Sequence, residues 1–552
     1  MNEDKWFYQN NDDLLNSDLN KTFAEILWMS NEDFRSWLYD LRKFVVKVWD
    51  EKGIPPKTGK QKSDIIKEMS KIRSYPIFHK KDGVEKIDLE TNQKDCITNN
   101  TKLGNCANQW FPNMMTTKIS YTKNLSDALS IYDHFKEDSL FDKMLLYAKR
   151  NFKRDSFYHY SPVVKKYSDK ESVDSYVKKY FIEPKDSAKS WILAYEQNRN
   201  GYEKDFDYWL DPVSDNQSYT GYNEELNLNN FFLSFDEYEE ISNSIDDKCK
   251  VNINHKTLKN KNFYQIRIFK RDTKLFPVGL KAFRVTFCQQ AVNFPPLTAR
   301  YLYERFTEHI KDQEVINIWD PSAGWGGRIL GAMSIENDVR KVHYIGTDPN
   351  TDNTTENGRT KYHELADFYN KYNHSAFSND AHTYEIYQVG SENMHKEENF
   401  QKYKGKLDLV FTSPPYFCKE VYSEDDTQSS RKFSEYEDWL EYYLKPTLKT
   451  AYDWLAPNRY LIWNIADINL GKNANYELEK YTHDLLTSFG MSYEGKLKMT
   501  LAQMPGGNRV DPVTGKPNCK NFCRIKETTR GIKVAKKHLW LKYEPIFIFK
   551  KI

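Results

Sequence analysis

The sequence predicts an α/β protein: a C-terminal Rossmann-like domain with a mostly parallel, seven-stranded sheet, preceded by a largely helical N-terminal accessory region. From residue 276 onward, short apolar runs alternate with helical segments, which is the pattern of a parallel sheet flanked by helices. Residues 1–275 contain helical stretches, such as 33–51, but no regular alternation of strands and helices. At 552 residues, the chain is also too long for one ordinary core.

Three domains follow from these differences in pattern. We predict a helical accessory segment at 1–90, a second accessory region at 91–275 and the α/β domain at 276–552. The apolar runs that predict strands of the α/β domain include 315–319, 342–346, 384–389, 407–412, 460–465 and 545–550.

A long helix is predicted between the fourth and fifth of these strands. Trp439, Tyr443 and Leu448 recur there at helical spacing. Ser434 and Glu437 have the spacing of a capping box at its start, and Pro446 is expected to kink it.

Composition excludes several classes of protein. The 81 basic and 79 acidic side chains leave a net charge of +2, which excludes a uniformly basic nucleic-acid coat but permits local basic patches. The seven cysteines lack paired CxxC spacing, the N-terminus has no signal pattern, and no apolar run approaches the roughly 18 residues that span a bilayer. We therefore predict a soluble cytoplasmic protein with reduced thiols and no bound metal.

A glycine-rich turn follows the first strand in the stretch DPSAGWGGRILGAMS, residues 320–334. Glycines between a strand and a helix let the backbone turn sharply and approach a ligand closely. Ile329 stands where the dinucleotide fingerprint needs its third glycine, and the stretch has no G-K-[ST] of a P-loop. A nucleoside without phosphates fits this turn better than a nucleotide does.

Two carboxylates complete the predicted nucleoside site. Asp348 ends the second strand about twenty residues after the turn, where an acidic side chain hydrogen-bonds ribose hydroxyls in such folds. Asp320, at the end of the first strand, is placed to reach the charged end of the ligand.

The stretch VFTSPPYF, residues 410–417, follows the fourth strand. Two consecutive prolines make a rigid, extended peptide with exposed carbonyls. In a parallel sheet this peptide would face the glycine turn across the crevice at the carboxyl ends of the strands. The hydroxyl of Ser413 and the carbonyl of Pro414 can accept the two N–H bonds of an exocyclic amine, and Tyr416 can stack on its ring.

These stretches resemble the amino-group DNA methyltransferases that use S-adenosyl-L-methionine, and the similarity covers about 276–552. In that family a D/N/S-P-P-Y/F tetrapeptide holds the target amine, which assigns catalysis here to Ser413, Pro414, Pro415 and Tyr416. The serine form is mostly associated with cytosine-N4 methylation, whereas aspartate or asparagine is commoner in adenine-N6 enzymes.

The resemblance also implies the cofactor site. This sequence matches the family's glycine loop, its ribose-binding acid and its methionine-binding segment, and Glu392 follows the third strand. The residues assigned to cofactor binding are Phe294, Pro295, Asp320, Pro321, Ser322, Gly324, Gly326, Asp348 and Glu392. Ser322 replaces the aromatic residue that the family has in this loop.

The function implied by the resemblance is DNA methylation with S-adenosyl-L-methionine, most simply at N4 of a flipped cytosine. The alternatives are adenine-N6 methylation, a catalytically silent DNA-binding protein, and an RNA or protein amide substrate. The cofactor loop precedes the catalytic loop, an order that differs from many cytosine-N4 enzymes.

Double-stranded DNA is the expected partner, with no membrane partner, and the N-terminal region is expected to help recognise the target. The enzyme would act with a restriction endonuclease or as a solitary or phage enzyme. A basic segment between the last two strands would contact phosphates beside the catalytic peptide. The residues predicted for this contact are Arg509, Lys516, Lys520, Arg524, Lys526 and Arg530.

Overall fold

The computed structural model describes part of the chain. The described ranges are 12–21, 31–54, 60–81, 84–87, 95–98, 103–119, 128–138, 191–194, 250–258, 261–270 and 291–552, the last with gaps at 337–339, 374–381, 424, 470–474, 502–520 and 526–538.

A nine-stranded sheet organises the C-terminal half, in the order β10-β9-β8-β11-β13-β18-β16-β3, with β17 also paired to β18. The strands are β3 (Cys96–Thr98), β8 (Val315–Asp320), β9 (Lys341–Thr347), β10 (Thr383–Tyr387), β11 (Leu407–Thr412), β13 (Leu455–Asn464), β16 (Met491–Thr500), β17 (Phe522–Ile525) and β18 (Leu539–Lys551). Only β18 runs against the other strands, because its pairs with β13, β16 and β17 are antiparallel and the other pairs are parallel. The prediction of a mostly parallel sheet is confirmed, and β3 and β17 extend the seven predicted strands to nine.

Alternating side chains of the central strands build two cores, one on each face of the sheet. On one face, Ile318 and Phe411 pack with α12 (Pro296–Thr307), α13 (Gly327–Met333) and α14 (Lys361–Asn373). On the other face, Trp319 and Val410 pack with the helical segment from α16 (Tyr436–Trp439) to α17 (Lys445–Trp454) and with α18 (Leu478–Ser488). β11 is buried at all six positions, as expected for a central parallel strand covered on both faces.

The long predicted helix is interrupted by a π-helical turn, η10 (Leu440–Leu444), between α16 and α17. Pro446 lies in the first turn of α17, directly after this π turn. The predicted capping box is wrong, because α16 begins at Tyr436 with Glu435 at the N-cap position and has no side-chain cap.

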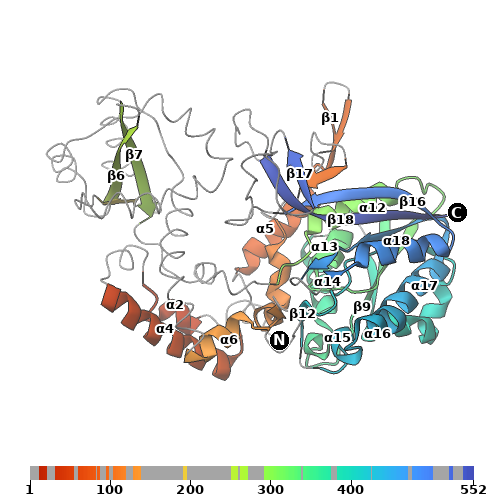
Figure 1. Ribbon diagram of the computed structural model, residues 1–552, viewed down its shortest axis with the longest axis horizontal. Helices are drawn as coiled ribbons and strands as arrows, with labels where there is room; N and C mark the ends of the chain where they lie inside the picture. Colours follow the sequence, from red (N-terminus) through yellow and green to blue (C-terminus); the bar gives the residue numbers. More distant parts are fainter. Residues whose placement is uncertain are drawn as a thin grey trace.

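Part of the N-terminal half packs into the same core as the sheet. The helix α5 (Lys62–Arg73) and the 3₁₀ segments η1 (Asn105–Trp110) and η2 (Pro112–Met115) contribute Ile65, Trp110, Phe111 and other side chains to the cluster around α12–α14. In Figure 1, α5 lies beside α13 and α14.

A second N-terminal cluster is formed by α2 (Asp12–Asn16), α4 (Asn31–Lys52) and α6 (Ile131–Lys136), where Phe34, Trp49 and Phe135 are buried. Among the remaining described N-terminal strands, β1 (Phe78–Lys81) pairs with β2 (Val84–Ile87), and β4 (Lys118–Ile119) pairs with β12 (Glu420–Val421). The strands β5 (Trp191–Ala194), β6 (Lys250–Leu258) and β7 (Lys261–Lys270) pair with one another in a closed barrel. The domain boundaries at 90 and 275 stay predictions, and most of 91–275 lies outside the described residues.

Within the part of the chain that the structure describes, no helix combines the length and apolar composition needed to cross a membrane.

Candidate functional site

The glycine turn connects the end of β8 to the start of α13. Gly324 and Gly326 have φ angles of +63° and +76°, a backbone conformation that glycine adopts without strain. A Cβ atom on Gly327, the first residue of α13, would lie 2.0 Å from the carbonyl oxygen of Phe294. The sequence therefore needs glycine here for both the turn and the close packing.

Asp320 stabilises this turn. Its carboxylate is fully buried and accepts hydrogen bonds from the Nε of Arg328 at 2.7 Å, the hydroxyl of Tyr344 at 2.6 Å and the Oγ1 of Thr412 at 2.7 Å. The backbone N–H of Ser322 donates a further bond at 3.2 Å. Because Arg328 is itself 4% exposed, the pair is a buried ion pair with its hydrogen bonds satisfied, which ties β8, β9, β11 and α13 together.

The segment before α12 clamps the same turn. Asn293 accepts from the backbone N–H of Gly327 at 3.1 Å and donates to the carbonyl of Trp325 at 2.6 Å. Phe294 packs against Phe411, with ring centroids 5.2 Å apart, and Pro295 is the N-cap residue of α12. Sequence reasoning selected Phe294 and Pro295 but not Asn293 and Arg328, although both lie inside the stretches 293–306 and 320–334 that it used.

Asp348 follows β9 and is partly exposed. Its Oδ2 accepts from the Nδ2 of Asn353 at 2.7 Å and from the hydroxyl of Tyr362, which also lies within hydrogen-bonding distance of the Gly324 carbonyl. Its Oδ1 accepts from the backbone N–H of Asn350 at 2.9 Å. Burial raises the pKa of the Asp348 carboxyl, against the hydrogen bonds that lower it. Tyr362 thus fixes Asp348 beside the glycine turn.

Glu392 lies after β10, on the 3₁₀ segment η8 (Ser391–Lys396), and is 7% exposed. Its Oε1 is 2.7 Å from the Nζ of Lys432, on α15 (Ser429–Lys432). The loops after β8, β9 and β10, which carry the predicted cofactor residues, therefore lie at one edge of the sheet.

The Ser-Pro-Pro-Tyr peptide follows β11 at the same edge, since β11 pairs in parallel with β8. Ser413, Pro415 and Tyr416 are partly exposed and Pro414 is buried. The Tyr416 hydroxyl is buried beside the backbone of Ala466, without a well-formed hydrogen bond to any described residue. Burial raises the pKa of Tyr416, and the charges of Glu544 and Glu420 raise it further.

Two carboxylates near Tyr416 were missed by sequence reasoning. Glu420 lies on β12 (Glu420–Val421), which pairs with β4 (Lys118–Ile119), and Glu544 lies on β18 just before Pro545. Burial, and then the charge of Glu420, raise the pKa of Glu544 to about 7. Two isolated glutamates 124 positions apart give no sequence motif, so only the fold brings them together.

Of the residues predicted to contact DNA, Arg524 lies on β17. β17 pairs with Leu539–Lys542, which precedes the segment of β18 paired with β13. Because β18 is antiparallel to β13, β17 lies toward the carboxyl edge that carries the Ser-Pro-Pro-Tyr peptide. Arg509, Lys516, Lys520, Lys526 and Arg530 lie outside the described residues.

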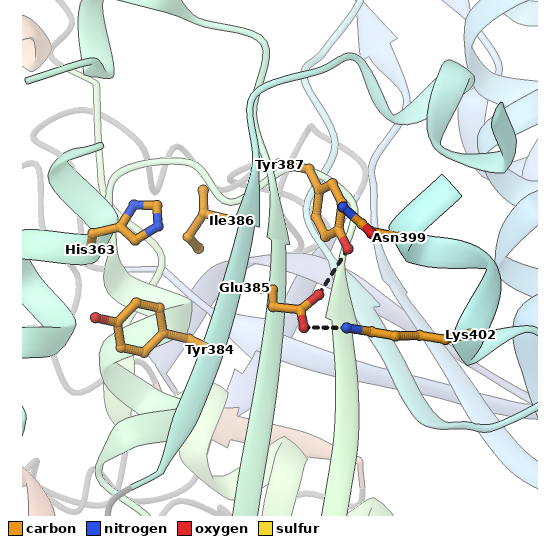
Figure 2. A pocket seen from close by; sticks show the side chains of 7 residues that line it. All are labelled: His363, Tyr384, Glu385, Ile386, Tyr387, Asn399 and Lys402. Atoms are coloured by element: carbon orange, nitrogen blue, oxygen red, sulfur yellow. Dashed lines mark hydrogen bonds and ion pairs between the residues drawn. The ribbon is translucent and has the colours of Figure 1, made fainter. Parts of the chain in front are cut away.

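A polar hollow of about 480 Å³ lies at β10, the edge strand of the sheet, and Figure 2 shows its lining. In this hollow the Glu385 carboxylate accepts hydrogen bonds from the Nζ of Lys402 at 2.5 Å and from the hydroxyl of Tyr387 at 2.8 Å. None of the predicted site residues lines this hollow, so we do not assign the reaction to it.

The Ser-Pro-Pro-Tyr peptide lies within a segment that matches a known family. The model of the N6/N4 DNA methylase family matches residues 407–551. The resemblance to amino-group DNA methyltransferases is thereby confirmed over this segment, which runs from β11 to β18 and includes Ser413–Tyr416. The mostly parallel sheet with helices on both faces has the Rossmann-like α/β architecture that the sequence predicted.

The solved structures that are similar to this chain are remote. One, assigned as a class I S-adenosylmethionine-dependent methyltransferase from Listeria monocytogenes, has 13% identity and a TM-score of 0.25, with 46% of this chain and 58% of that chain covered. Another, an S-adenosylmethionine-dependent O-methyltransferase from Thermotoga maritima, has 7% identity and a TM-score of 0.25, with 54% of this chain and 77% of that chain covered. A search of curated proteins found no match.

The DNA methylase family implies S-adenosyl-L-methionine as the methyl donor. The residues present fit this group. The positive-φ glycines bring backbone to the crevice, and Asp348 is a partly exposed carboxylate whose Oδ1 accepts, among described residues, the one N–H of Asn350.

Proposed function

We propose that this protein is a DNA methyltransferase that transfers a methyl group from S-adenosyl-L-methionine to the exocyclic amine of a flipped base, namely N4 of cytosine. The observation that carries the proposal is the Ser-Pro-Pro-Tyr peptide at the carboxyl end of β11, inside the DNA methylase match and one strand from the glycine turn. The serine in this peptide favours cytosine.

Ser413 and Pro414 act on the target amine. The Ser413 Oγ and the Pro414 carbonyl accept one N–H bond each, which pulls the planar nitrogen toward a tetrahedral shape and frees its lone pair. When bound, the donor supplies an electrophilic methyl group. No strong base is needed before the amine attacks, because the nitrogen becomes acidic once it is alkylated.

Tyr416 holds the flipped base. An exocyclic amine cannot be reached while the base is stacked in the duplex, and unstacking costs a few kcal/mol. Stacking on the Tyr416 ring offsets part of this cost, by about 1–3 kcal/mol for a base–aromatic contact.

The cofactor residues divide into two roles. Asp348 accepts the ribose hydroxyls, while Asp320, whose carboxylate is already engaged by Arg328, Tyr344 and Thr412, fixes the shape of the loop from Pro321 to Gly326. Phe294, Pro295 and Glu392 border the same crevice.

Double-stranded DNA is the proposed substrate and partner. The basic residues from Arg509 to Arg530 are proposed to contact its phosphates, and the N-terminal region to help read the target. The enzyme acts either beside a restriction endonuclease or alone.

Adenine-N6 methylation is the second candidate. The matching family covers both reactions, and the cofactor loop precedes the catalytic loop. The same Ser413 and Pro414 acceptors would hold the adenine amine.

Single-molecule sequencing of DNA from cells that express the protein tests the proposal, since it reports the base and the motif together. We expect N4-methylcytosine at a defined motif, absent from cells that express Ser413→Ala. Detection of N6-methyladenine without N4-methylcytosine would identify adenine as the target base. Unmodified DNA would favour a catalytically silent protein.

A further inference from the structure

The π turn at Leu440–Leu444 is an irregular feature that the proposed function does not explain. A π turn is rare, and single π turns inside α-helices frequently lie at functional sites. It carries Tyr443, which is 3% exposed, next to Tyr442, which is 56% exposed. The irregular turn therefore presents one buried tyrosine to the interior and leaves its neighbour on the surface.

The Tyr443 hydroxyl lies where the loops of the cofactor crevice meet. It is 3.4 Å from the Oγ of Ser322, in the loop after β8. Ser391, after β10, is also a hydrogen-bonding neighbour, and the charges of Glu392 and Asp348 act on the hydroxyl. Tyr443, which lies in the core beside α16 and α17, thus contacts the loops after β8 and β10, and the charge of Asp348, after β9, acts on it.

The chemistry of this hydroxyl suits a ligand contact. A tyrosine hydroxyl is neutral near pH 7 and has a proton to donate, and burial raises the pKa of Tyr443 further. Its 3.4 Å contact with Ser322 is at the long end of the hydrogen-bond range, which makes it a weak bond that a better acceptor can replace.

We propose that Tyr443 is a further cofactor-binding residue, whose hydroxyl hydrogen-bonds the nucleoside part of S-adenosyl-L-methionine. This inference rests on the proposed function for the identity of the cofactor. The methyl group must face Ser413, after β11, whereas Tyr443 contacts Ser322, after β8, and Ser391, after β10, and the charge of Asp348, after β9, acts on it. The part of the cofactor that lies there is the nucleoside and not the reacting sulfur.

The test compares Tyr443→Phe with Tyr442→Phe in the full-length protein. Calorimetry measures the affinities for S-adenosylhomocysteine and for 5′-methylthioadenosine, which keeps the nucleoside but lacks the amino acid. Loss of one neutral hydrogen bond should weaken both ligands by the same factor, about 3- to 10-fold, in Tyr443→Phe alone. The melting temperature of the ligand-free variant should stay near that of the wild type, because phenylalanine keeps the packing.

Unchanged affinity for both ligands would overturn the inference. Weaker binding of S-adenosylhomocysteine with unchanged binding of 5′-methylthioadenosine would also overturn it, since the hydroxyl would then contact the amino-acid part. The result is independent of methylation: if the expected losses are found in a protein that methylates no DNA, the proposed function fails and the assignment of Tyr443 stands.

Discussion

Asp320 and Asp348 are both carboxylates at strand ends, and their surroundings give them different tasks. Asp320 is fully buried, and Arg328 neutralises its charge. Asp348 is partly exposed and, among described residues, receives one N–H bond on Oδ1. Both residues are visible in the sequence as strand-end acids, but burial separates the one that shapes the loop from the one that can meet ribose.

Asp348→Ala should weaken S-adenosylhomocysteine binding with little change in DNA affinity. Losing a charged hydrogen bond to ribose costs about 1.5–3 kcal/mol, or about 10- to 150-fold in the dissociation constant. Calorimetry measures it, with the exposed Asp352→Ala in the same loop as control. Unchanged affinity in Asp348→Ala would move the ribose contact elsewhere.

Glu544 predicts a pH dependence of stability. Its pKa is about 7 in the folded protein against an ordinary value of 4.5, and the groups that act on it are Glu420 and Lys542. The folded state therefore binds more protons than the unfolded state between these values, so this residue makes stability fall as pH rises from about 4.5 to about 7.

Glu544→Gln should remove that dependence. At pH 8 the variant should unfold with a free energy about 3 kcal/mol above that of the wild type, and the two should converge near pH 4. Urea unfolding at several pH values measures this difference. A difference that does not vary with pH would mean that the pKa of Glu544 is the same in the folded and the unfolded protein.

At the scale of elements, residues 422, 423 and 425–428 lie across the loops after β8 and β9. Thr351 donates to Asp425 at 2.6 Å, Thr427 donates to the carbonyl of Pro349 at 3.2 Å, and the ring of Tyr422 is 5.3 Å from that of Trp325. The hydrogen bond from Thr351 lowers the pKa of Asp425, which keeps it charged. We call residues 422, 423 and 425–428 the strap.

Asp425→Ala should loosen the strap and speed cofactor release. Because the contact is exposed, we expect a modest effect, about 3- to 10-fold on the dissociation rate of S-adenosylhomocysteine. Stopped-flow displacement measures the rate, with the exposed neighbour Asp426→Ala as control. Equal rates in the two variants would mean that the strap does not retain the cofactor.

Elements that are apolar and covered on both faces were predictable, and short ones were not. β11 was predicted residue for residue, since Leu407–Thr412 is a continuous buried run. β3 and β17 have three and four residues, too few to show a period, and β3 pairs with β16 about 400 positions away. The π turn was missed because helical spacing continues through it.

At the scale of the whole molecule, one core joins N-terminal and C-terminal segments. Phe111 packs on Tyr362, with ring centroids 5.1 Å apart. A Cβ atom on Gly326 would lie 2.7 Å from the ring of Phe111. Arg300 of α12 donates to the carbonyl of Ile72, at 2.8 Å. Helical periodicity identified apolar faces in the first half of the chain, but it does not say what covers them.

Phe111→Ala should lower both stability and cofactor affinity. Removing a buried phenylalanine costs about 3–5 kcal/mol, and here the cavity opens under the glycine turn. Phe34→Ala, in the separate cluster of α4, should destabilise its own cluster but leave S-adenosylhomocysteine affinity unchanged. Equal affinity in both variants would show that the N-terminal segment only covers the core.

Ser413→Ala tests the central claim most directly, because the claim assigns catalysis to an acceptor of the target amine. Single-turnover methylation of saturating DNA should be slower by about 100-fold, by analogy with the loss of one preorganised hydrogen bond in other active sites, while DNA and S-adenosylhomocysteine still bind. The methylated nucleoside from the wild-type reaction, identified by mass spectrometry, should be N4-methylcytosine. A Ser413→Ala variant that methylates DNA at the wild-type rate would contradict the account.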